Sequence, residues 1–316
     1  MKYPPVSVII PTIDRARKMK NCLVSVLDNS FPSFEVCVVD QSEGGETENL
    51  VKKLNAEKIK YFHLNKVGKS LALNFALSKT RAEIVCFTDD DCVVDRNWLK
   101  EIFSSFRNHK QIDGVFGSSF GYRPQKNGGL YCPSVFNRKE KQVIAGPANH
   151  WSSFGFGNNM SFRSEVFRDL SGFKTWLGPG SVGKYGEETE FCYRYLDSGR
   201  SILYNPKVKI YHDNWIDSRR MTRLKDDYNF GLYAAYGYHA VRSRGHARKF
   251  LLEALRERAR RARKDLFNAL WGGHWVYFAK RVLIFPSRVF YHLKWLGLVI
   301  YYSFFKKEAA CESKLL

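Results

Sequence analysis

Short apolar runs alternate with amphipathic segments through the first two hundred residues of the chain. Four runs rich in Val, Ile and Phe have the length and composition of buried strands. The segments between them carry apolar residues three and four positions apart, which is the spacing of a helix with one buried face. This pattern predicts strands at 6–12, 34–42, 59–64 and 82–91, and helices at 17–30, 46–56 and 70–80.

Strands and helices in this order predict an α/β fold, with a mostly parallel central sheet flanked by helices and joined by right-handed crossovers. Open sheets of this kind bind ligands beyond the carboxyl ends of their strands. Three of the four predicted strands end in a polar cluster, written PTIDR, DQS and TDDD in the sequence. We therefore expect the functional site at that edge of the sheet.

The composition changes twice further along the chain. From Gly114 the sequence is irregular and rich in glycine and aromatic residues, as is typical of segments that shape a substrate pocket. After about residue 240 a helical stripe of Leu and Ala runs among many arginines, and an aromatic segment follows. We expect a catalytic domain over 1–240 and a basic, aromatic helical extension over 241–316.

The net charge of +20 is concentrated in the last quarter of the chain, where residues 242–316 hold 17 Lys and Arg against 5 Asp and Glu. Such a basic region favours an anionic partner, either nucleic acid or a lipid surface. Because the sequence contains no recognisable nucleic-acid-binding module, we expect an anionic membrane and no nucleic acid, and a nucleic-acid-binding protein is an alternative. The aromatic residues could instead pack on the catalytic domain or form an interface in a homo-oligomer.

Three features bear on where the protein works. The longest charge-free piece of the extension, 295–305, is about half of the roughly 20 residues that a membrane-spanning helix needs. The apolar run at the N-terminus is too short for a signal peptide. The seven cysteines form no CxxC pair and are typical of reduced, buried thiols. We therefore expect a cytoplasmic protein associated peripherally with the inner face of the cell membrane.

Three consecutive aspartates, Asp89, Asp90 and Asp91, end the fourth predicted strand. Like charges side by side are costly unless something positive holds them. Mg²⁺ or Mn²⁺ takes hard oxygen ligands and shares its shell with a bound diphosphate, while a neighbouring carboxylate can accept from a ribose hydroxyl. A helix N-cap is the alternative role, but Asp95 alone could cap the helix that follows. The cluster therefore predicts a metal or nucleotide site.

The segment NKVGKS, 65–70, resembles the end of a phosphate-binding loop and supports a rival function, a nucleoside-triphosphatase or kinase. Such a loop needs a glycine at position 63, where this chain has His63. Without that glycine the backbone cannot curl around a β-phosphate. Lys69 is kept as a candidate phosphate or base contact, with Gly68 beside it at the nucleotide.

The segment YGEETEF places Glu187, Glu188 and Glu190 at the start of a predicted helix. Glutamates at a helix N-terminus are favourable in themselves. The glycine-rich GPGSVGKYG before them lets the helix end approach a ligand closely, and a carboxylate within reach of a hydroxyl can act as a general base. His212 ends another candidate strand, and taken alone it has the features of a core histidine.

Seven segments occur in an order that closely resembles the family 2 glycosyltransferases of the GT-A fold. The resemblance runs from about residue 6 to residue 212, two thirds of the chain. It rests on VSVIIPTIDR, FEVCVVDQS, NKVGKSLALNFAL, IVCFTDDDCVVDRNWL, GFGNNMSFRSEVF, GEETEFCYRYLDSG and ILYNPKVKIYH.

The resemblance also implies roles for individual residues. Asp91, in the position of the family's DxD element, and His212 would hold Mn²⁺ or Mg²⁺, and Asp89 and Asp90 would hold the ribose. Asp40 would hold the base. Pro11, Thr12, Arg15 and Lys69 would border the nucleotide, and Gly157, Asn158 and Asn159 would shape the sugar and acceptor pocket.

The predicted function is transfer of a sugar from a nucleotide-diphosphate donor to a hydroxyl of a saccharide or lipid-linked saccharide. We expect a metal-dependent single displacement with inversion, and UDP is the commonest donor nucleotide of the family. The family's usual catalytic pair is Glu-Asp, whereas this chain has Glu187-Glu188, so Glu188 takes the base position with one extra methylene. Glu187 and Glu190 are alternative candidates for the base.

Overall fold

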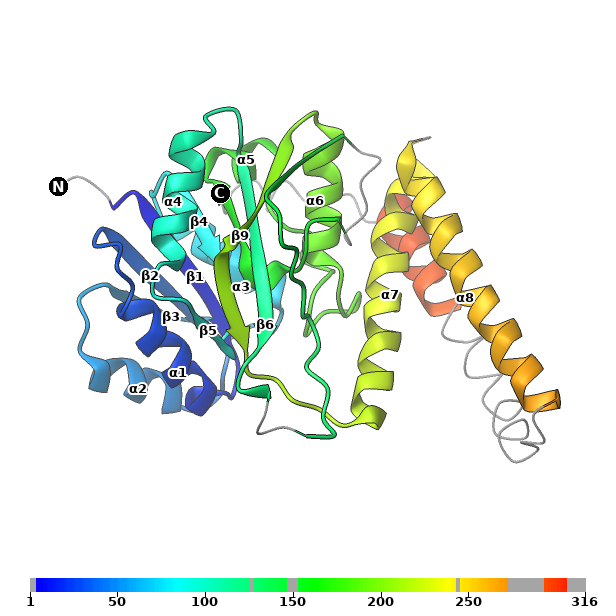
Figure 1. The fold of residues 1–316 in the computed structure, drawn as a ribbon, viewed down its shortest axis with the longest axis horizontal. Coiled ribbons are helices and arrows are strands. Elements are labelled where there is room, and N and C mark those ends of the chain that lie inside the picture. The colour runs from blue at the N-terminus through cyan, green and yellow to red at the C-terminus, as the bar shows by residue number, and fades with distance from the viewer. Residues whose placement is uncertain (1–3, 125–127, 147–152, 243–244, 272–292, 306–316) are drawn as a thin grey trace.

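The computed structural model describes residues 4–124, 128–146, 153–242, 245–271 and 293–305. They form a nine-stranded sheet with helices on both faces, and a layer of helices stands beside it (Figure 1). The strands are β1 (Val6–Thr12), β2 (Phe34–Asp40), β3 (Ile59–His63), β4 (Ile84–Phe87), β5 (Cys92–Val94), β6 (Gly114–Gly121), β7 (Gln142–Ala145), β8 (Met160–Arg163) and β9 (Ser201–His212). The helices are α1 (Ala16–Leu27), α2 (Glu46–Leu54), α3 (Lys69–Lys79), α4 (Trp98–Asn108), α5 (Glu165–Asp169), α6 (Glu187–Asp197), α7 (Ser218–Arg242) and α8 (His246–Trp271), with short turns η3 (Gly157–Asn159) and η4 (Tyr301–Phe305).

β3, β2, β1 and β4 lie side by side in that order and run parallel. Helices cover both faces of these strands, which is why apolar residues fill them almost without polar alternation. The predicted strands and helices of this half are confirmed, with differences of a few residues at their ends. Since β1 and β4 are neighbours, the residues that follow Thr12 and Phe87 meet at one edge of the sheet.

The second half of the sheet is mixed. β8 runs antiparallel between β4 and β6, β9 pairs in parallel with β6, and β5 and β7 pair antiparallel with β9. β6 approaches β9 so closely that a Cβ on Gly117 would lie 2.1 Å from the carbonyl oxygen of Val208. Only glycine fits there, so the residue type that obscured the strand pattern in the sequence is required by the strand itself.

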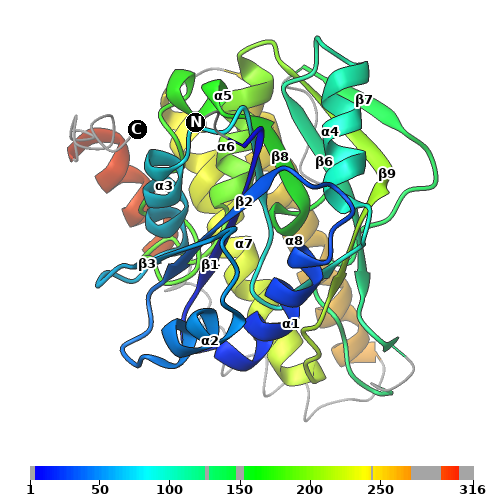
Figure 2. The same ribbon diagram turned by 90° about the vertical axis from the view of Figure 1, so that its left-hand side faces the viewer.

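The helices divide between the two faces of the sheet. α1, α2 and α4 pack on one face and α3, α5 and α6 on the other. In Figure 2 the sheet passes between α3 on one side and α1 and α4 on the other. The loops that follow the parallel strands therefore emerge together at one edge of the sheet, where ligands bind in open sheets of this kind.

α7 packs against α6, and α8 packs against α7, beside the sheet (Figure 1). The contact between α7 and the start of α6 is made by backbone. A Cβ on Gly231 would lie 2.2 Å from the carbonyl oxygen of Tyr185, and one on Gly186 would lie 2.7 Å from the carbonyl oxygen of Gly231. Gly186 and Gly231 therefore set the spacing between α6 and α7. The predicted domain boundary near residue 240 falls just before the end of α7 and stays a prediction.

Residues 293–305 are helical and lie against α7. Trp295 is buried beside Tyr233, and Tyr302 stacks on Trp176 with ring centroids 4.5 Å apart. Trp295 and Tyr302 therefore pack on the protein, and the expected membrane contact of this aromatic segment stays a prediction. Over the described residues, no helix is both long enough and apolar enough to cross a bilayer.

Candidate active site

A cavity of about 360 Å³ opens beyond the carboxyl ends of β1 and β4. Its walls come from these strand ends, the starts of α3 and α6, the loop around η3 and one face of α7. Twelve of the predicted site residues line it, namely Pro11, Thr12, Arg15, Lys69, Asp89, Asp90, Asp91, Gly157, Asn158, Glu187, Glu188 and His212.

Each of the three aspartates contacts at least one positively charged side chain, and Arg15 is shared by two of them. Lys69 Nζ lies 2.6 Å from Asp89 Oδ1. Thr12 donates to Asp90 at 2.7 Å, and Arg15 Nη1 bridges Asp90 and Asp91 at 3.1 and 3.0 Å. These contacts position the three carboxylates, but the lining still contains five carboxylates against the permanent charges of one arginine and one lysine. The site is therefore suited to a further cation.

The aspartates differ in how readily they ionise. Burial and the neighbouring charge of Asp91 raise the pKa of Asp90 to about 6, although Arg15 and Thr12 stabilise its carboxylate. Burial also opposes ionisation of Asp91, but its hydrogen bond with His212 and the nearby cations outweigh burial and hold the pKa of Asp91 below its usual value. Asp91 is therefore the carboxylate of this pair that stays charged most easily, as a metal ligand must.

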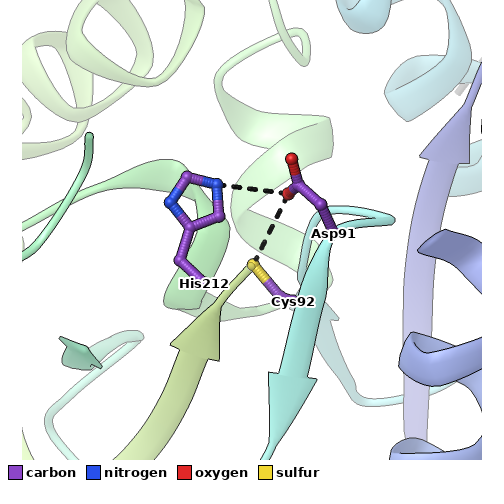
Figure 3. Close-up of side chains that lie close together, drawn as sticks. All are labelled: Asp91, Cys92 and His212. Carbon is purple, nitrogen blue, oxygen red and sulfur yellow. Dashed lines mark hydrogen bonds and ion pairs between the residues drawn. The ribbon is translucent and has the colours of Figure 1, made fainter. Parts of the chain in front are cut away.

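Asp91 Oδ1 and His212 Nε2 lie 3.2 Å apart, at the start of β5 and the end of β9 (Figure 3). Two adjacent ligands of one Mg²⁺ or Mn²⁺ ion are about 3 Å apart, because each bond is about 2.1 Å long. His212 Nδ1 lies 2.8 Å from the carbonyl oxygen of Pro133, so Nδ1–H donates and Nε2 faces Asp91. Cys92 is also near, but burial raises the pKa of its thiol, which disfavours the thiolate that binds metals. Burial opposes a proton on His212, but the hydrogen bonds with Asp91 and Cys132 outweigh burial and raise the pKa of His212 to about 10. A divalent ion held by Asp91 and His212 would therefore replace the proton on Nε2.

Glu187 and Glu188 begin α6, directly after Gly186, whose φ of +92° is left-handed. Glu187 is buried with Oε1 3.6 Å from Lys69 Nζ, and Glu188 is half-buried. Burial and the charge of Glu187 raise the pKa of Glu188 to about 8. A Cβ on Gly157 would lie 3.2 Å from Glu188 Cβ, so the η3 loop packs directly on Glu188. A cavity-facing carboxylate with a raised pKa is suited to proton transfer.

Glu190, an alternative candidate for the base, lies elsewhere. Its carboxylate is fully buried and contacts Arg194 Nε at 2.7 Å and His239 Nε2 at 2.8 Å. Burial opposes ionisation, but these partners lower the pKa of Glu190. Glu190 therefore connects α6 to α7 through His239, and we correct its candidate role as the base.

Two buried groups in the cavity wall have no hydrogen-bond partner among the described residues. They are the side-chain amide of Asn158 and Oε2 of Glu187. Buried polar groups are almost always paired in folded proteins, so unpaired ones in a cavity indicate where a ligand supplies the partner. They come from the η3 loop and from α6, on two adjacent walls.

Three predicted site residues do not line the cavity. Asn159 donates to the carbonyl oxygens of Ser118 and Val208 at 2.9 and 3.0 Å and accepts from Trp98 Nε1 at 2.8 Å. Its predicted substrate contact is therefore corrected to a role in fixing the loop. The carboxylate of Asp40 is buried between Ser42 and Tyr61, and Gly68, with φ +146°, is the N-cap of α3.

The wall of the cavity that α7 supplies was not among the predicted site residues. Leu224, Tyr228 and Leu232 line the cavity at a spacing of four residues, with Asn229 beside them and Tyr185 from the loop before α6. The spacing of four is typical of any packed helix face, so the pattern within 218–242 does not indicate that this face borders a cavity.

The sequence profile of the family described as Glycosyl transferase family 2 matches residues 7–171, which is more than half of the chain. The chain belongs to this family. It is a glycosyltransferase that moves a sugar from a nucleotide-sugar donor. Family membership therefore favours glycosyl transfer over the two alternatives, a nucleoside-triphosphatase or kinase and a nucleic-acid-binding protein.

Curated relatives of this glycosyltransferase act on several kinds of acceptor. The glucosyl-dolichyl phosphate glucuronosyltransferase of Haloferax volcanii is 22% identical over 227 residues, 66% of this chain and 68% of the relative. Glycosyltransferase AglE of the same organism is 25% identical over 213 residues, 64% of each chain. The poly(ribitol-phosphate) beta-N-acetylglucosaminyltransferase TarP of Staphylococcus aureus is 30% identical over 119 residues, 35% of this chain and 36% of TarP. The chain thus spans about two thirds or less of these relatives.

Solved structures share the fold of this glycosyltransferase. TarS of S. aureus in complex with UDP has a TM-score of 0.61 at 20% identity, covering 94% of this chain and 90% of that one. The mannosyltransferase PcManGT of Pyrobaculum calidifontis in complex with GDP-Man and Mn²⁺ has a TM-score of 0.59 at 19% identity, covering 98% and 89%. The predicted GT-A type α/β fold is confirmed.

Proposed function

We propose that this glycosyltransferase transfers a glycosyl group from a nucleoside-diphosphate sugar, with UDP as the first nucleotide to test, to a hydroxyl of a saccharide or lipid-linked saccharide, with inversion. One observation carries the proposal. A single cavity joins the aspartates after β4, the Asp91–His212 pair and the two glutamates that begin α6. Groups suited to a diphosphate and a group suited to proton transfer thus share one space.

In the half of the cavity proposed to bind the nucleotide sugar, Asp89 and Asp90 accept hydrogen bonds from the hydroxyl groups of the ribose. Arg15 and Lys69 hold these carboxylates in place now, and both cations line the cavity where phosphate oxygens would bind. Asp91 and His212 would hold Mn²⁺ or Mg²⁺. When bound, the ion would neutralise charge on the departing diphosphate.

In the proposed reaction, the acceptor oxygen attacks the anomeric carbon from the face opposite the diphosphate. The bond from that carbon to the diphosphate oxygen breaks, and the acceptor proton passes to the carboxylate of Glu188. Glu188 is the better candidate because it is half-buried at the cavity, whereas Glu187 is buried beside Lys69. Glu187 raises the pKa of Glu188 and therefore strengthens it as a base once it is ionised.

Relatives support a lipid-linked acceptor. One acts on glucosyl-dolichyl phosphate, and a Campylobacter jejuni relative, 33% identical over 93 residues, is a GalNAc(5)-diNAcBac-PP-undecaprenol beta-1,3-glucosyltransferase. The surface of residues 293–305 supports peripheral attachment to an anionic membrane. Besides the exposed Lys294, this segment has apolar side chains that are between 42% and 68% exposed, namely Leu293, Leu296, Ile300, Tyr301 and Phe304.

A thermal-shift screen tests the transferase proposal. UDP-, GDP- and CMP-sugars, ATP and duplex DNA are each added with and without Mn²⁺. We expect one nucleotide sugar to raise Tm, and Mn²⁺ to increase the shift, because a ligand that binds only the folded state stabilises it. Stabilisation by ATP alone, or by no nucleoside-diphosphate sugar, would contradict the proposal.

Co-sedimentation with anionic vesicles tests the membrane proposal. The double variant Leu296→Glu/Ile300→Glu places charges on the outward face of 293–305 and should lose most of the binding of the wild-type chain. Val24→Glu is the matched control, because Val24 is a 48% exposed residue of α1, outside this surface. Equal binding by all three proteins would rule out attachment through 293–305.

A further inference from the structure

The position of α7 is fixed relative to the two glutamates that begin α6. The Gly231 backbone of α7 meets the Tyr185 and Gly186 backbone, and Gly186 directly precedes Glu187. Tyr228, three residues before this contact, and Leu232, directly after it, both line the cavity. A molecule that brings a hydroxyl to Glu188 from the side of Tyr228 and Leu232 therefore lies along α7.

The surface that α7 presents there is aromatic and apolar. Tyr185 and Tyr228 pack edge to face with ring centroids 4.6 Å apart at 89°. Tyr228 OH lies 3.3 Å from Ser134 Oγ, so Tyr228 is held both by the ring of Tyr185 and at its hydroxyl. Leu224 and Leu232 lie one turn before and after it. A fixed aromatic ring between two leucines suits the apolar C–H face of a pyranose.

The charges of the cavity are unevenly distributed. Among the lining residues that the structure describes, Arg15, Lys69 and His212 carry or can carry positive charge, and each contacts an aspartate after β4. α7 contributes Leu224, Tyr228, Asn229 and Leu232, none of them charged. An anionic group placed on Tyr228 would thus find no counter-charge among the α7 residues that line the cavity and would lie near Glu187 and Glu188, while Arg220 is one turn before Leu224, outside the lining.

We propose that the α7 face, with Tyr185 and Ser134, is the acceptor subsite and takes an uncharged pyranose ring stacked on Tyr228. The inference rests on the proposed glycosyl transfer and narrows its acceptor class to neutral saccharides, as against polyol phosphates or uronic acids. Asn229, beside Tyr228 on the helix, supplies a donor and an acceptor for ring hydroxyls.

Saturation-transfer NMR on the full chain tests this. The probes are octyl β-D-glucopyranoside, octyl β-D-galactopyranoside, octyl β-D-glucuronide and ribitol 5-phosphate, all below micellar concentration. We expect transfer to the ring protons of at least one neutral pyranoside and little to the two anionic probes. Tyr228→Ala should weaken this signal about tenfold, whereas Tyr228→Phe should keep most of it because the ring remains.

Tyr131→Ala is the matched control, since Tyr131 is a 53% exposed tyrosine that does not line the cavity. Folding of each variant is checked by its Tm shift with the nucleotide sugar and Mn²⁺. If the wild-type chain shows no Tm shift with the nucleotide sugar and Mn²⁺, that result would count against the proposed function. A normal Tm shift with no pyranoside signal would overturn only the proposal of an acceptor subsite on α7. Equal pyranoside signals in Tyr228→Ala and wild type, or stronger signals from the anionic probes, would also overturn it.

Leu224→Lys provides a second test of the acceptor subsite, one that leaves the aromatic ring of Tyr228 in place. It adds a cation to the α7 face, so it should increase the signal of the glucuronide relative to the glucopyranoside. An unchanged ratio would place the carboxylate, and with it the sugar ring, away from α7.

Discussion

The two walls of the cavity differ in the way each is held together. The strand-end wall, made of residues after β1, β4 and β9, is a network of charges in which Arg15, Lys69 and His212 each contact an aspartate. The α7 wall is held by the close approach of Gly231 to α6 and by aromatic packing. The charged wall suits a diphosphate and a metal, and the apolar wall suits a neutral ring. Glu188 stands where the two walls meet.

Removing the carboxylate of Glu188, where the two walls meet, should have the largest effect on activity. Glu188→Gln keeps the size of the side chain but cannot accept a proton, so we expect kcat for transfer to fall by about 10²- to 10⁴-fold. Because neither wall is disturbed, the Tm shift with nucleotide sugar and Mn²⁺ should be retained. Wild-type kcat in this variant would remove Glu188 from the mechanism.

A change confined to the strand-end wall should come next. Asp91→Asn removes one proposed metal ligand, and we expect the Mn²⁺-dependent part of the nucleotide-sugar Tm shift to disappear and activity to fall by about 10- to 100-fold or more. Pyranoside binding measured by NMR should be unchanged. Asp28→Asn, at a 71% exposed aspartate side chain, is the control. A full Mn²⁺ response in Asp91→Asn would break the assignment of the metal to this wall.

A change confined to the α7 wall should have an intermediate effect. Gly231→Ala forces α7 away from α6, which should cost about 1 to 3 kcal/mol of unfolding free energy and raise KM for the acceptor more than for the donor. Gly237→Ala is the matched control on the same helix, because the atoms nearest to its Cβ would belong to the side chains of Val299 and Trp295, at 2.9 and 3.3 Å, and not to the backbone of α6. If Gly231→Ala changes only the donor KM, the two walls are not separable.

The smallest expected effect concerns pH. Burial and the Glu187 charge raise the pKa of Glu188 to about 8, and the base works only when deprotonated. The rate should therefore rise with pH and level off above about pH 8. Glu187→Gln removes the like charge and should shift this rise to lower pH by about one unit, while loss of all activity would indicate that Glu187 is the base.

The two walls also differ in how far the sequence predicted them. Strand periodicity located β1 to β4, and because these strands are parallel their polar ends had to meet at one edge. Asp89, Asp90 and Asp91 were found in this way, the likeness of NKVGKS to a phosphate-binding loop pointed to Lys69, and the family resemblance added His212. The α7 wall was missed because its apolar stripe resembles that of any packed helix, and nothing in the sequence indicates that one face borders a cavity.

Asn158 and Asn159 are identical side chains at adjacent positions, yet one lines the cavity and the other is buried in hydrogen bonds to β6, β9 and α4. The sequence alone determined the α/β fold, the functional edge of the sheet and the charges gathered there, because these follow from residue spacing and type. The tertiary structure decided which asparagine faces the ligand, which glutamate is locked beside Arg194 and His239, and which helix closes the cavity. Those depend on contacts between segments far apart in the chain, which no local pattern encodes.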